Sequence, residues 1–281
     1  MKKMGISILR PMTHHPRRII AITCIYLCAL CVLRGKAFSA ELPEVIRVVT
    51  YNIHHGEGTD GKIDLERIAK VLRAESPDVV ALNEVDQGTR RTHRIDMPAE
   101  LARLTGMQAI FEKNIDHDGG RYGNAVLTRL PIRRHKNHKL PSNYEGEQRG
   151  MLEVELGDKE AGPSVLFFAT HFDYRPDDTE RLASVKKVAE ILADRENQPA
   201  ILAGDLNATP DSQVIANLSK TWQRTNAKDL ATYPAAKPEK QIDYVFVRPA
   251  ERWKVIETRV LDEPVASDHR GVLAVVQRSD P

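Results

Sequence analysis

The chain has 281 residues and a formal net charge of +2, with 41% hydrophobic and 28% charged residues. This length allows one large domain or two small ones with a substantial core, and outside the first forty residues the composition is that of an ordinary soluble globular protein. All three cysteines lie within those forty residues, which excludes disulfides, a thiolate nucleophile and cysteine-ligated zinc from any domain that begins after residue 40.

Residues 1–40 have the three-part pattern of a secretory signal. Five basic residues precede the uncharged run at residues 19–33, and a small-residue segment at 37–40 leads into Glu41. The pattern predicts export, to the periplasm or the outside of the cell, with cleavage near Ala40. The uncharged run is short for a bilayer crossing, which usually needs about 20 residues. Because Arg34 and Lys36 follow the run closely, an uncleaved membrane anchor is the alternative.

The net positive charge of the chain comes from residues 1–40. Seven of the 41 Lys and Arg residues and none of the 39 acidic residues lie in it, so residues 41–281 carry a formal charge of −5. Sequence-neutral binding of nucleic acid usually depends on a basic face, and a body of this charge does not by itself predict one. A local basic patch could still be formed by Arg90, Arg91, Arg94, Arg133, Arg134, Lys136 and Lys139.

Short apolar runs rich in β-branched residues predict the strands of the first half. We expect strands at residues 45–52, 78–84, 122–128, 149–156 and 164–170, an extended stretch at 131–140, and helices at 63–74 and 98–104. Residues 88–96 form a basic loop that is either a solvated face or a contact with an anionic substrate.

The second half continues with a long amphipathic helix at residues 176–195. A short helix is expected at 212–218, and strands at 199–202, 241–247, 253–260 and 271–276. No linker or low-complexity tract interrupts residues 41–281, so we expect one domain there. Several strands follow one another directly while others are separated by helices, which favours a mixed sheet system with helical cover.

The strand at 199–202 leads into Ala-Gly-Asp-Leu-Asn-Ala-Thr-Pro at residues 203–210. If the backbone stays extended, Asp205 and Asn207 point to the same side, at the mouth of a sheet. A carboxylate that can hold a water or a metal, next to a neutral donor for an anionic oxygen, suits attack on a phosphate ester. The plain alternative is a strand followed by an Asx turn.

Polar residues recur at the predicted ends of apolar strands over more than two hundred positions. They are Asn52, Glu84, His171, Asp205 with Asn207, Asp243, and Asp268 with His269. Each has an ordinary structural explanation when taken alone. Together they form a set of carboxylates, amides and imidazoles, and the absence of a Gly-x-Ser-x-Gly motif argues against a serine hydrolase of that type.

Seven short segments resemble, in order, the motifs of the endonuclease/exonuclease/phosphatase superfamily, which includes deoxyribonucleases, apurinic-site endonucleases, sphingomyelinases and inositol-polyphosphate phosphatases. They are Thr50-Tyr51-Asn52-Ile53, Leu82-Asn83-Glu84-Val85, Tyr122-Gly123-Asn124-Ala125-Val126-Leu127, Thr170-His171, Gly204-Asp205-Leu206-Asn207, Ile242-Asp243-Tyr244 and Ser267-Asp268-His269. The resemblance implies an α/β fold: a four-layer α/β/β/α sandwich of two mixed sheets covered by helices, with residues 41–281 as the catalytic domain.

The same resemblance implies a divalent-metal site for Mg²⁺ or Mn²⁺. Glu84 matches the principal ligand, Asn52 lies beside it, and Asp268 completes or adjoins the site. Oxygen ligands of this kind suit a hard dication that keeps several waters.

The resemblance also implies the catalytic roles. Asp205 would orient or deprotonate the attacking water, Asn207 would hold a phosphate oxygen, and His269, oriented by Asp243, would contact the phosphate or transfer a proton. His171 matches a second histidine at the phosphate site, and Arg149 resembles an arginine that contacts phosphate.

The substrate is open between two kinds of phosphoester. A secreted nuclease-type phosphodiesterase acting on DNA or RNA is the first interpretation, and a phosphodiesterase or phosphatase acting on lipid head groups or other small phosphoesters is the second. A binding subunit without turnover is disfavoured because each expected catalytic position carries a competent side chain. We expect a monomer, with membrane contact only if the leader stays attached or the substrate is a lipid.

Overall fold

The computed structural model describes residues 42–158 and 162–279, so the predicted leader lies outside the described residues. Twelve strands and four α-helices are found in the described part of the chain. In chain order the elements are β1 (Val45–Asn52), η1 (His54–Gly56), α1 (Leu65–Glu75), β2 (Val79–Gln87), α2 (Met97–Thr105), β3 (Gln108–His117), β4 (Gly120–Thr128), β5 (Ile132–Lys139), β6 (Gly150–Leu156), β7 (Val165–His171), α3 (Thr179–Ile191), β8 (Ala200–Asp205), α4 (Gln213–Leu218), β9 (Gln223–Arg224), β10 (Asp243–Arg248), η2 (Ala250–Arg252), β11 (Trp253–Val260) and β12 (Val272–Arg278).

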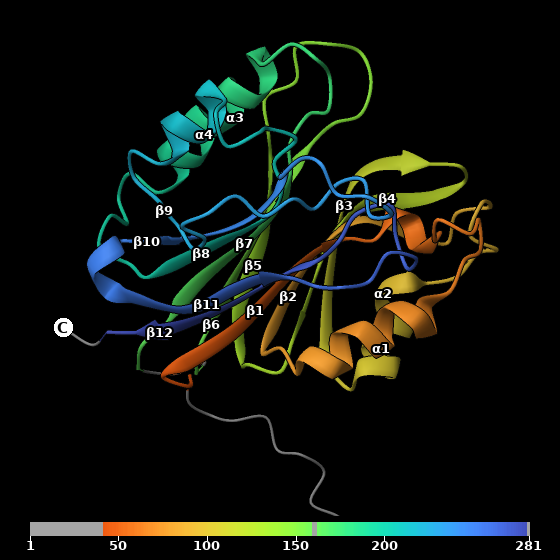
Figure 1. Ribbon diagram of the computed structural model, residues 1–281, viewed down its shortest axis with the longest axis horizontal. Helices are drawn as coiled ribbons and strands as arrows, with labels where there is room; N and C mark the ends of the chain where they lie inside the picture. Colours follow the sequence, from red (N-terminus) through yellow and green to blue (C-terminus); the bar gives the residue numbers. More distant parts are fainter. Residues whose placement is uncertain (1–41, 159–161, 280–281) are drawn as a thin grey trace, which may run out of the picture. The chain divides into compact units, whose positions relative to one another are not determined.

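The strands form two six-stranded sheets (Figure 1). The first has the order β11-β12-β1-β2-β4-β3 and the second the order β5-β6-β7-β8-β10-β9. Each contains one parallel pair, β1 with β2 and β7 with β8, while the other pairings are antiparallel. In both parallel pairs a helix lies between the strands in sequence, α1 in the first and α3 in the second, because a parallel connection must cross back over the sheet.

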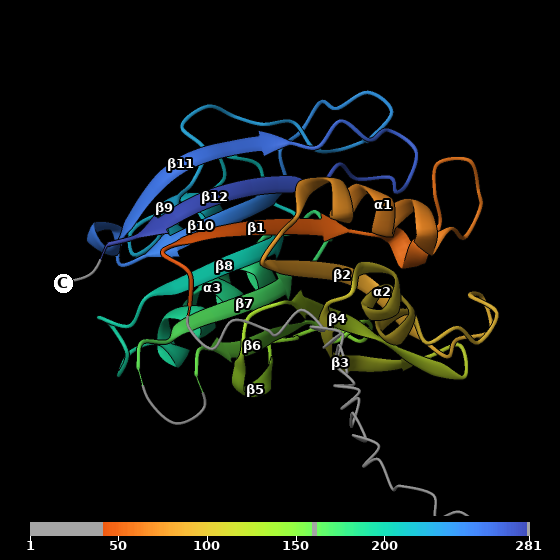
Figure 2. The same ribbon diagram turned by 90° about the horizontal axis from the view of Figure 1, so that it is seen from below.

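Three clusters of buried apolar side chains lie between the four layers, which are two sheets and two sets of helices. Side chains such as Val48 and Phe167 pack between the two sheets. On the outer face of the first sheet, Val49 and its neighbours pack against α1 and α2, and on the outer face of the second, Phe168 packs with residues of α3 and α4. Figure 2 shows the two helix layers on opposite sides of the paired sheets. The expected α/β/β/α sandwich of two mixed sheets is confirmed.

Alternation along the strands explains this arrangement. Val48 and Phe167 face the inner layer, while the next residues, Val49 and Phe168, face the helices. Successive side chains of a strand point to opposite faces, so strands buried on both faces need the continuous apolar runs seen in the sequence.

The structure differs from the sequence-based expectation in several elements, and the two-residue strand β9 is one that was not predicted. β3 was not predicted, because Gln108–His117 is mostly half-exposed and carries charged residues along its length. The predicted helix at 176–195 is shorter and spans Thr179–Ile191. The second strand does not stop at Glu84 but continues to Gln87. No helix in the described residues is long and apolar enough to cross a membrane.

Gly204 allows β7 and β8 to approach closely just before the functional residues of β8. A Cβ atom at this position would lie 1.8 Å from the Thr170 carbonyl oxygen. We expect Gly204→Ala to lower the free energy of unfolding by about 3 kcal/mol or more, because the backbones would have to separate. Urea denaturation followed by circular dichroism measures this change.

Gly61→Ala is the matched control. Gly61 also has a positive φ of 72°, but a Cβ there meets no atom within 4 Å. The expected cost is the conformational one of about 1–2 kcal/mol. Equal destabilisation by the two substitutions would contradict the steric argument for Gly204.

Candidate active site

The carboxyl ends of the two parallel strand pairs meet at one place in the molecule. In the first sheet Asn52 pairs in register with Asn83, the residue before Glu84. In the second sheet His171 pairs in register with Asp205. The Asn52 amide nitrogen lies 2.9 Å from Glu84 Oε1 and 3.1 Å from Asp205 Oδ2, and so joins the two sheets. Residues far apart in the sequence therefore converge as predicted.

Glu84 reaches this place through a β-bulge. The register between β2 and β4 shifts between Leu82 and Val85, and Glu84 has a φ of 59°. A bulge of this kind re-aims a side chain without ending the strand. The carboxylate is thus presented to the site from within β2, where the sequence had indicated a strand end.

Asp243 also differs from its predicted position, since it begins β10 rather than ending a strand. The antiparallel pairing of β10 with β8 places it opposite Asp205. Its Oδ2 lies 2.9 Å from His269 Nδ1, and His269 Nε2 lies 3.7 Å from Asp205 Oδ2. Ligand-type atoms of Asp205, Asp243 and His269 all lie within 4.8 Å of one another.

This buried cluster shifts the pKa values of its members. Burial and, next to it, the nearby Asp243 carboxylate raise the pKa of Asp205 to about 7. Burial lowers the pKa of His269, but the carboxylates of Asp243 and Asp205 outweigh it and raise the pKa to about 10. At neutral pH His269 is therefore an imidazolium, and Asp205 is poised between its acid and base forms.

His171 has the opposite charge state. Burial and the adjacent Arg149 hold the pKa of His171 well below its usual value, so its imidazole is neutral. Arg149 Nη1 donates to His171 Nδ1 at 2.9 Å, and because a guanidinium only donates, the proton of the imidazole resides on Nε2. That nitrogen lies 3.5 Å from Asp205 Oδ2, which can accept its proton, and 3.1 Å from Asn207 Nδ2, which only donates and so is not an acceptor for it.

Asn207 does not follow Asp205 in extended backbone. Its φ is 48°, and its backbone N–H donates to Asp205 Oδ1 at 2.9 Å. The Asx turn considered in the sequence is present, and it still brings both side chains to the pocket.

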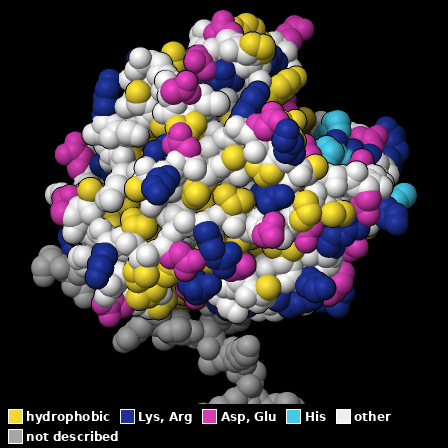
Figure 3. Space-filling model, in the orientation of Figure 1, with side chains coloured by type: hydrophobic (Ala, Val, Ile, Leu, Met, Phe, Trp, Pro, Cys, Tyr) yellow, Lys and Arg dark blue, Asp and Glu magenta, His cyan; other side chains and the backbone are white. Residues whose placement is uncertain are grey.

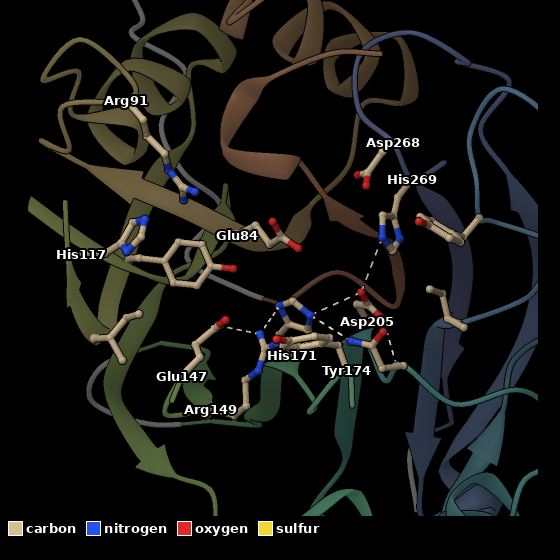
Figure 4. Close-up of a pocket in the computed structure, with 15 residues that line it drawn as sticks. Glu84, Arg91, His117, Glu147, Arg149, His171, Tyr174, Asp205, Asp268 and His269 are labelled. Carbon is tan, nitrogen blue, oxygen red and sulfur yellow. Dashed lines mark hydrogen bonds and ion pairs between the residues drawn. The ribbon is translucent and has the colours of Figure 1, made fainter. Parts of the chain in front are cut away.

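A cavity of about 540 Å³ contains most of these groups. In Figure 4, Glu84, Asp205, Asp268 and His269 face one part of it, while Arg91, His117, Glu147 and Arg149 face the other. Ile115, Tyr122, Tyr174, Asn207, Tyr233 and Ile242 also line it, with His171. Asn52 and Asp243 stand behind the lining and contact residues that form it.

Four pocket residues carried no clear sequence signal. Arg91 belongs to the basic loop, whose contact with substrate was one of two alternatives. His117 ends β3, which was not predicted. Glu147 lies in the loop between β5 and β6, and Tyr174 lies in the loop between β7 and α3. Glu147 Oε1 lies 2.6 Å from Arg149 Nη1, so the predicted phosphate contact at Arg149 has an acidic neighbour.

Three of the basic residues that could bind nucleic acid form ion pairs within the protein, whereas Arg94 donates to the backbone oxygens of Gly88 and Gly119. Arg90 pairs with Asp118 at 2.9 Å, Arg91 with Asp86 at 2.7 Å, and Arg134 with Glu155 at 2.6 Å. Figure 3 shows Lys and Arg side chains interspersed with Asp and Glu over the visible face. These pairs reduce the net positive field that a polyanion would meet.

The chain matches the model of the endonuclease/exonuclease/phosphatase family over residues 49–269, and it therefore belongs to this family. Members of the family are hydrolases that act on phosphoesters, and the fold and the site described above agree with that class.

Among known proteins, the chain is 26% identical over 219 residues to the uncharacterized protein YbhP of Escherichia coli K12, which covers 73% of this chain and 85% of that protein. An endonuclease/exonuclease/phosphatase structure from Beutenbergia cavernae aligns with a TM-score of 0.66 and 29% identity, over 84% of this chain and 72% of that one. The mannosyl-6-phosphatase of Bacteroides thetaiotaomicron aligns with a TM-score of 0.68 and 21% identity, over 82% and 99% of the two chains.

The family is typically dependent on a divalent metal, and the residues present fit such an ion. Glu84 and Asp268 line the same cavity, and both offer the oxygen ligands that hard cations prefer. Asn52 donates its amide N–H groups to two carboxylates, while its amide oxygen accepts from His54 N at 3.1 Å. In this arrangement Asn52 positions Glu84 and Asp205, and its role as a ligand stays a prediction.

The Asp243–His269 pair predicts a pH-dependent contribution to stability. The pKa of His269 is raised to about 10 from an unfolded value of about 6.5, so the folded state is stabilised fully below about pH 6.5 and the effect is lost as pH rises through 10. In metal-free protein we expect Asp243→Asn to lower the free energy of unfolding by about 3 kcal/mol at pH 6. The difference from wild type should shrink steadily towards pH 10 in urea melts.

Asp262→Asn is the control for this measurement. Asp262 forms an ion pair with Arg270, but its side chain is 94% exposed, and such a pair contributes little. A difference between wild type and Asp243→Asn that does not change from pH 6 to pH 10 would contradict the charged state of His269.

Proposed function

We propose that the chain is an exported, divalent-metal-dependent hydrolase that cleaves phosphodiester bonds of small molecules, with Mg²⁺ or Mn²⁺ as its cofactor. Glu84 and Asp268 would hold the ion, which supplies a Lewis acid for the phosphoryl oxygens. The leader motif supports export, and the composition of the pocket supports the choice of substrate.

The proposed mechanism follows from the charge states of the pocket. Asp205, with a pKa of about 7, accepts a proton from the attacking water, because a general base is most effective near the working pH. His269 is positively charged and stabilises charge that develops on the phosphoryl group, or gives its proton to the leaving oxygen. The neutral His171 and the Asn207 amide donate hydrogen bonds to a nonbridging oxygen.

A small substrate is favoured over nucleic acid by the pairing of the basic residues. Arg90, Arg91 and Arg134 each have a carboxylate partner. Around the cavity the carboxylates of Glu84, Glu147, Asp205 and Asp268 outnumber the two guanidinium groups. A bound dication and the charged His269 would offset most of this negative charge. A polyanion gains little further attraction from this surface.

Glu84→Ala tests the metal-dependent reaction. We expect it to abolish hydrolysis of bis-p-nitrophenyl phosphate in Mg²⁺ or Mn²⁺ while the far-ultraviolet circular dichroism stays unchanged, because the proposed principal ligand is lost. Glu112→Ala is the control, since Glu112 on β3 is outside the residues that line this cavity. Full activity of Glu84→Ala would overturn the assignment.

The salt dependence of the rate separates the two kinds of substrate. Residues 41–281 are assayed in Mg²⁺ on bis-p-nitrophenyl phosphate, glycerophosphocholine, sphingomyelin vesicles, RNA and plasmid DNA at 50 and 200 mM salt. We expect turnover of a small diester to change by less than about twofold, because few phosphates are neutralised. Faster cleavage of DNA or RNA, falling by about tenfold or more over this range, would favour the nuclease alternative, and a preference for vesicles would favour the lipid one.

A further inference from the structure

Two histidines beside Glu84 are not used by the mechanism above. His54 and His55 form the turn η1 directly after β1, and neither is among the residues that line the cavity. One ligand-type atom from each of His54, His55 and Glu84 lies within 4.8 Å of the other two. Two imidazoles and a carboxylate are characteristic ligands of a divalent transition metal.

The backbone at these three residues is in the left-handed region. The φ angles are 44° at His54, 43° at His55 and 59° at Glu84. For residues with a side chain this conformation is unfavourable and persists where the surrounding structure enforces it, often at functional sites. The strain has a geometric result here, because it turns two successive side chains of one segment and one of the neighbouring strand towards each other.

The His54 ring makes a hydrogen bond typical of metal-binding histidines, and the His55 ring lies near a carboxylate. His54 Nδ1 lies 3.2 Å from the backbone oxygen of Glu57, and since that oxygen only accepts, Nδ1 carries the proton and Nε2 keeps a lone pair. His55 Nε2 lies 3.5 Å from the Glu57 carboxylate. Histidines that bind a metal usually donate their other ring N–H to a carboxylate or a carbonyl oxygen in this way.

The remaining nitrogen of His55 has no partner in the described structure. His55 Nδ1 is buried without a hydrogen bond, in a side chain that is 12% exposed. A buried polar atom without a partner is costly and calls for an explanation such as a bound ion. Glu84 can contribute as well, because Asn52 donates to Oε1 and a carboxylate has a second oxygen.

We propose that His54, His55 and Glu84 bind a second divalent cation of the transition-metal type, such as Mn²⁺ or Zn²⁺. Glu84 is shared between this position and the oxygen-lined position that includes Asp268, and to that extent the inference rests on the proposed function. Mg²⁺ prefers oxygen ligands and is disfavoured at the histidine position. The protein therefore has two cation positions of different chemistry joined by one carboxylate.

The test is the number of Mn²⁺ ions bound by tag-free residues 41–281, measured by equilibrium dialysis and elemental analysis. The variant is His54→Asn/His55→Asn, because Asn tolerates the left-handed backbone and has no imidazole. His135→Asn, at a side chain that is 45% exposed on β5, is the control. We expect two ions in wild type and in the control, and one in the double variant or a second-site affinity at least tenfold weaker.

A spectroscopic measurement makes the result independent of the stability of the variant. Electron spin echo spectra of bound Mn²⁺ should show ¹⁴N couplings from histidine in wild type, in His269→Asn and in Asp268→Asn. The couplings should disappear in the double variant, or be reduced in each single variant if the double variant does not fold. Absence of histidine couplings in wild type, or equal binding by wild type and the double variant, overturns the proposal.

The outcomes distinguish this inference from the proposed function. Nitrogen-coupled Mn²⁺ in a protein that hydrolyses none of the phosphoesters above would support the histidine site and refute the function. Hydrolysis that depends on Glu84, with one Mn²⁺ and no nitrogen coupling, would refute the histidine site alone.

Discussion

The arrangement of the site depends on two buried asparagines that connect the sheets. Asn83 of β2 accepts from Asp205 N at 3.0 Å and donates to Thr170 O at 2.9 Å and to Asn124 Oδ1 at 3.0 Å. Asn124 of β4 donates to Gly150 O of β6 at 2.9 Å. Between the sheets the packing is otherwise largely apolar, and apolar contacts are not directional. These amides therefore fix how the strand ends of one sheet stand against those of the other.

The sequence predicts the central strands, such as β6, β7, β8 and β10, because their apolar runs are buried on both faces and carry their own signal. It does not predict β3, whose half-exposed residues alternate weakly. It also misplaces Glu84 and Asp243 within their strands, because a bulge and an antiparallel start are set by the neighbouring strand. Such features depend on pairing partners that are distant in the chain, and no local pattern contains them.

The order of the motifs selects residues that the fold brings to one cavity, but it does not give their charge states. His269 is cationic only because Asp243 and Asp205 lie beside it, whereas His171 is neutral because it is buried next to Arg149. The basic loop illustrates the same limit. Its arginines indicated a contact with an anionic substrate as one alternative, and only the fold shows that Asp118 pairs with Arg90 and Asp86 with Arg91.

The proposed cation ligands come from the first sheet, whereas the proposed base Asp205 and the phosphate contact His171 come from the second; His269, which follows Asp268, belongs with the first. Glu84 lies on β2 of the first sheet, and Asp268 lies between β11 and β12 of the same sheet. His171 and Asp205 end β7 and β8 of the second. In-line attack needs the water, the phosphorus and the charged groups to be held within a fraction of an ångström. The distance between the groups of the two sheets is therefore set by the packing and by the asparagine hydrogen bonds between the sheets. Neither motif sets it alone.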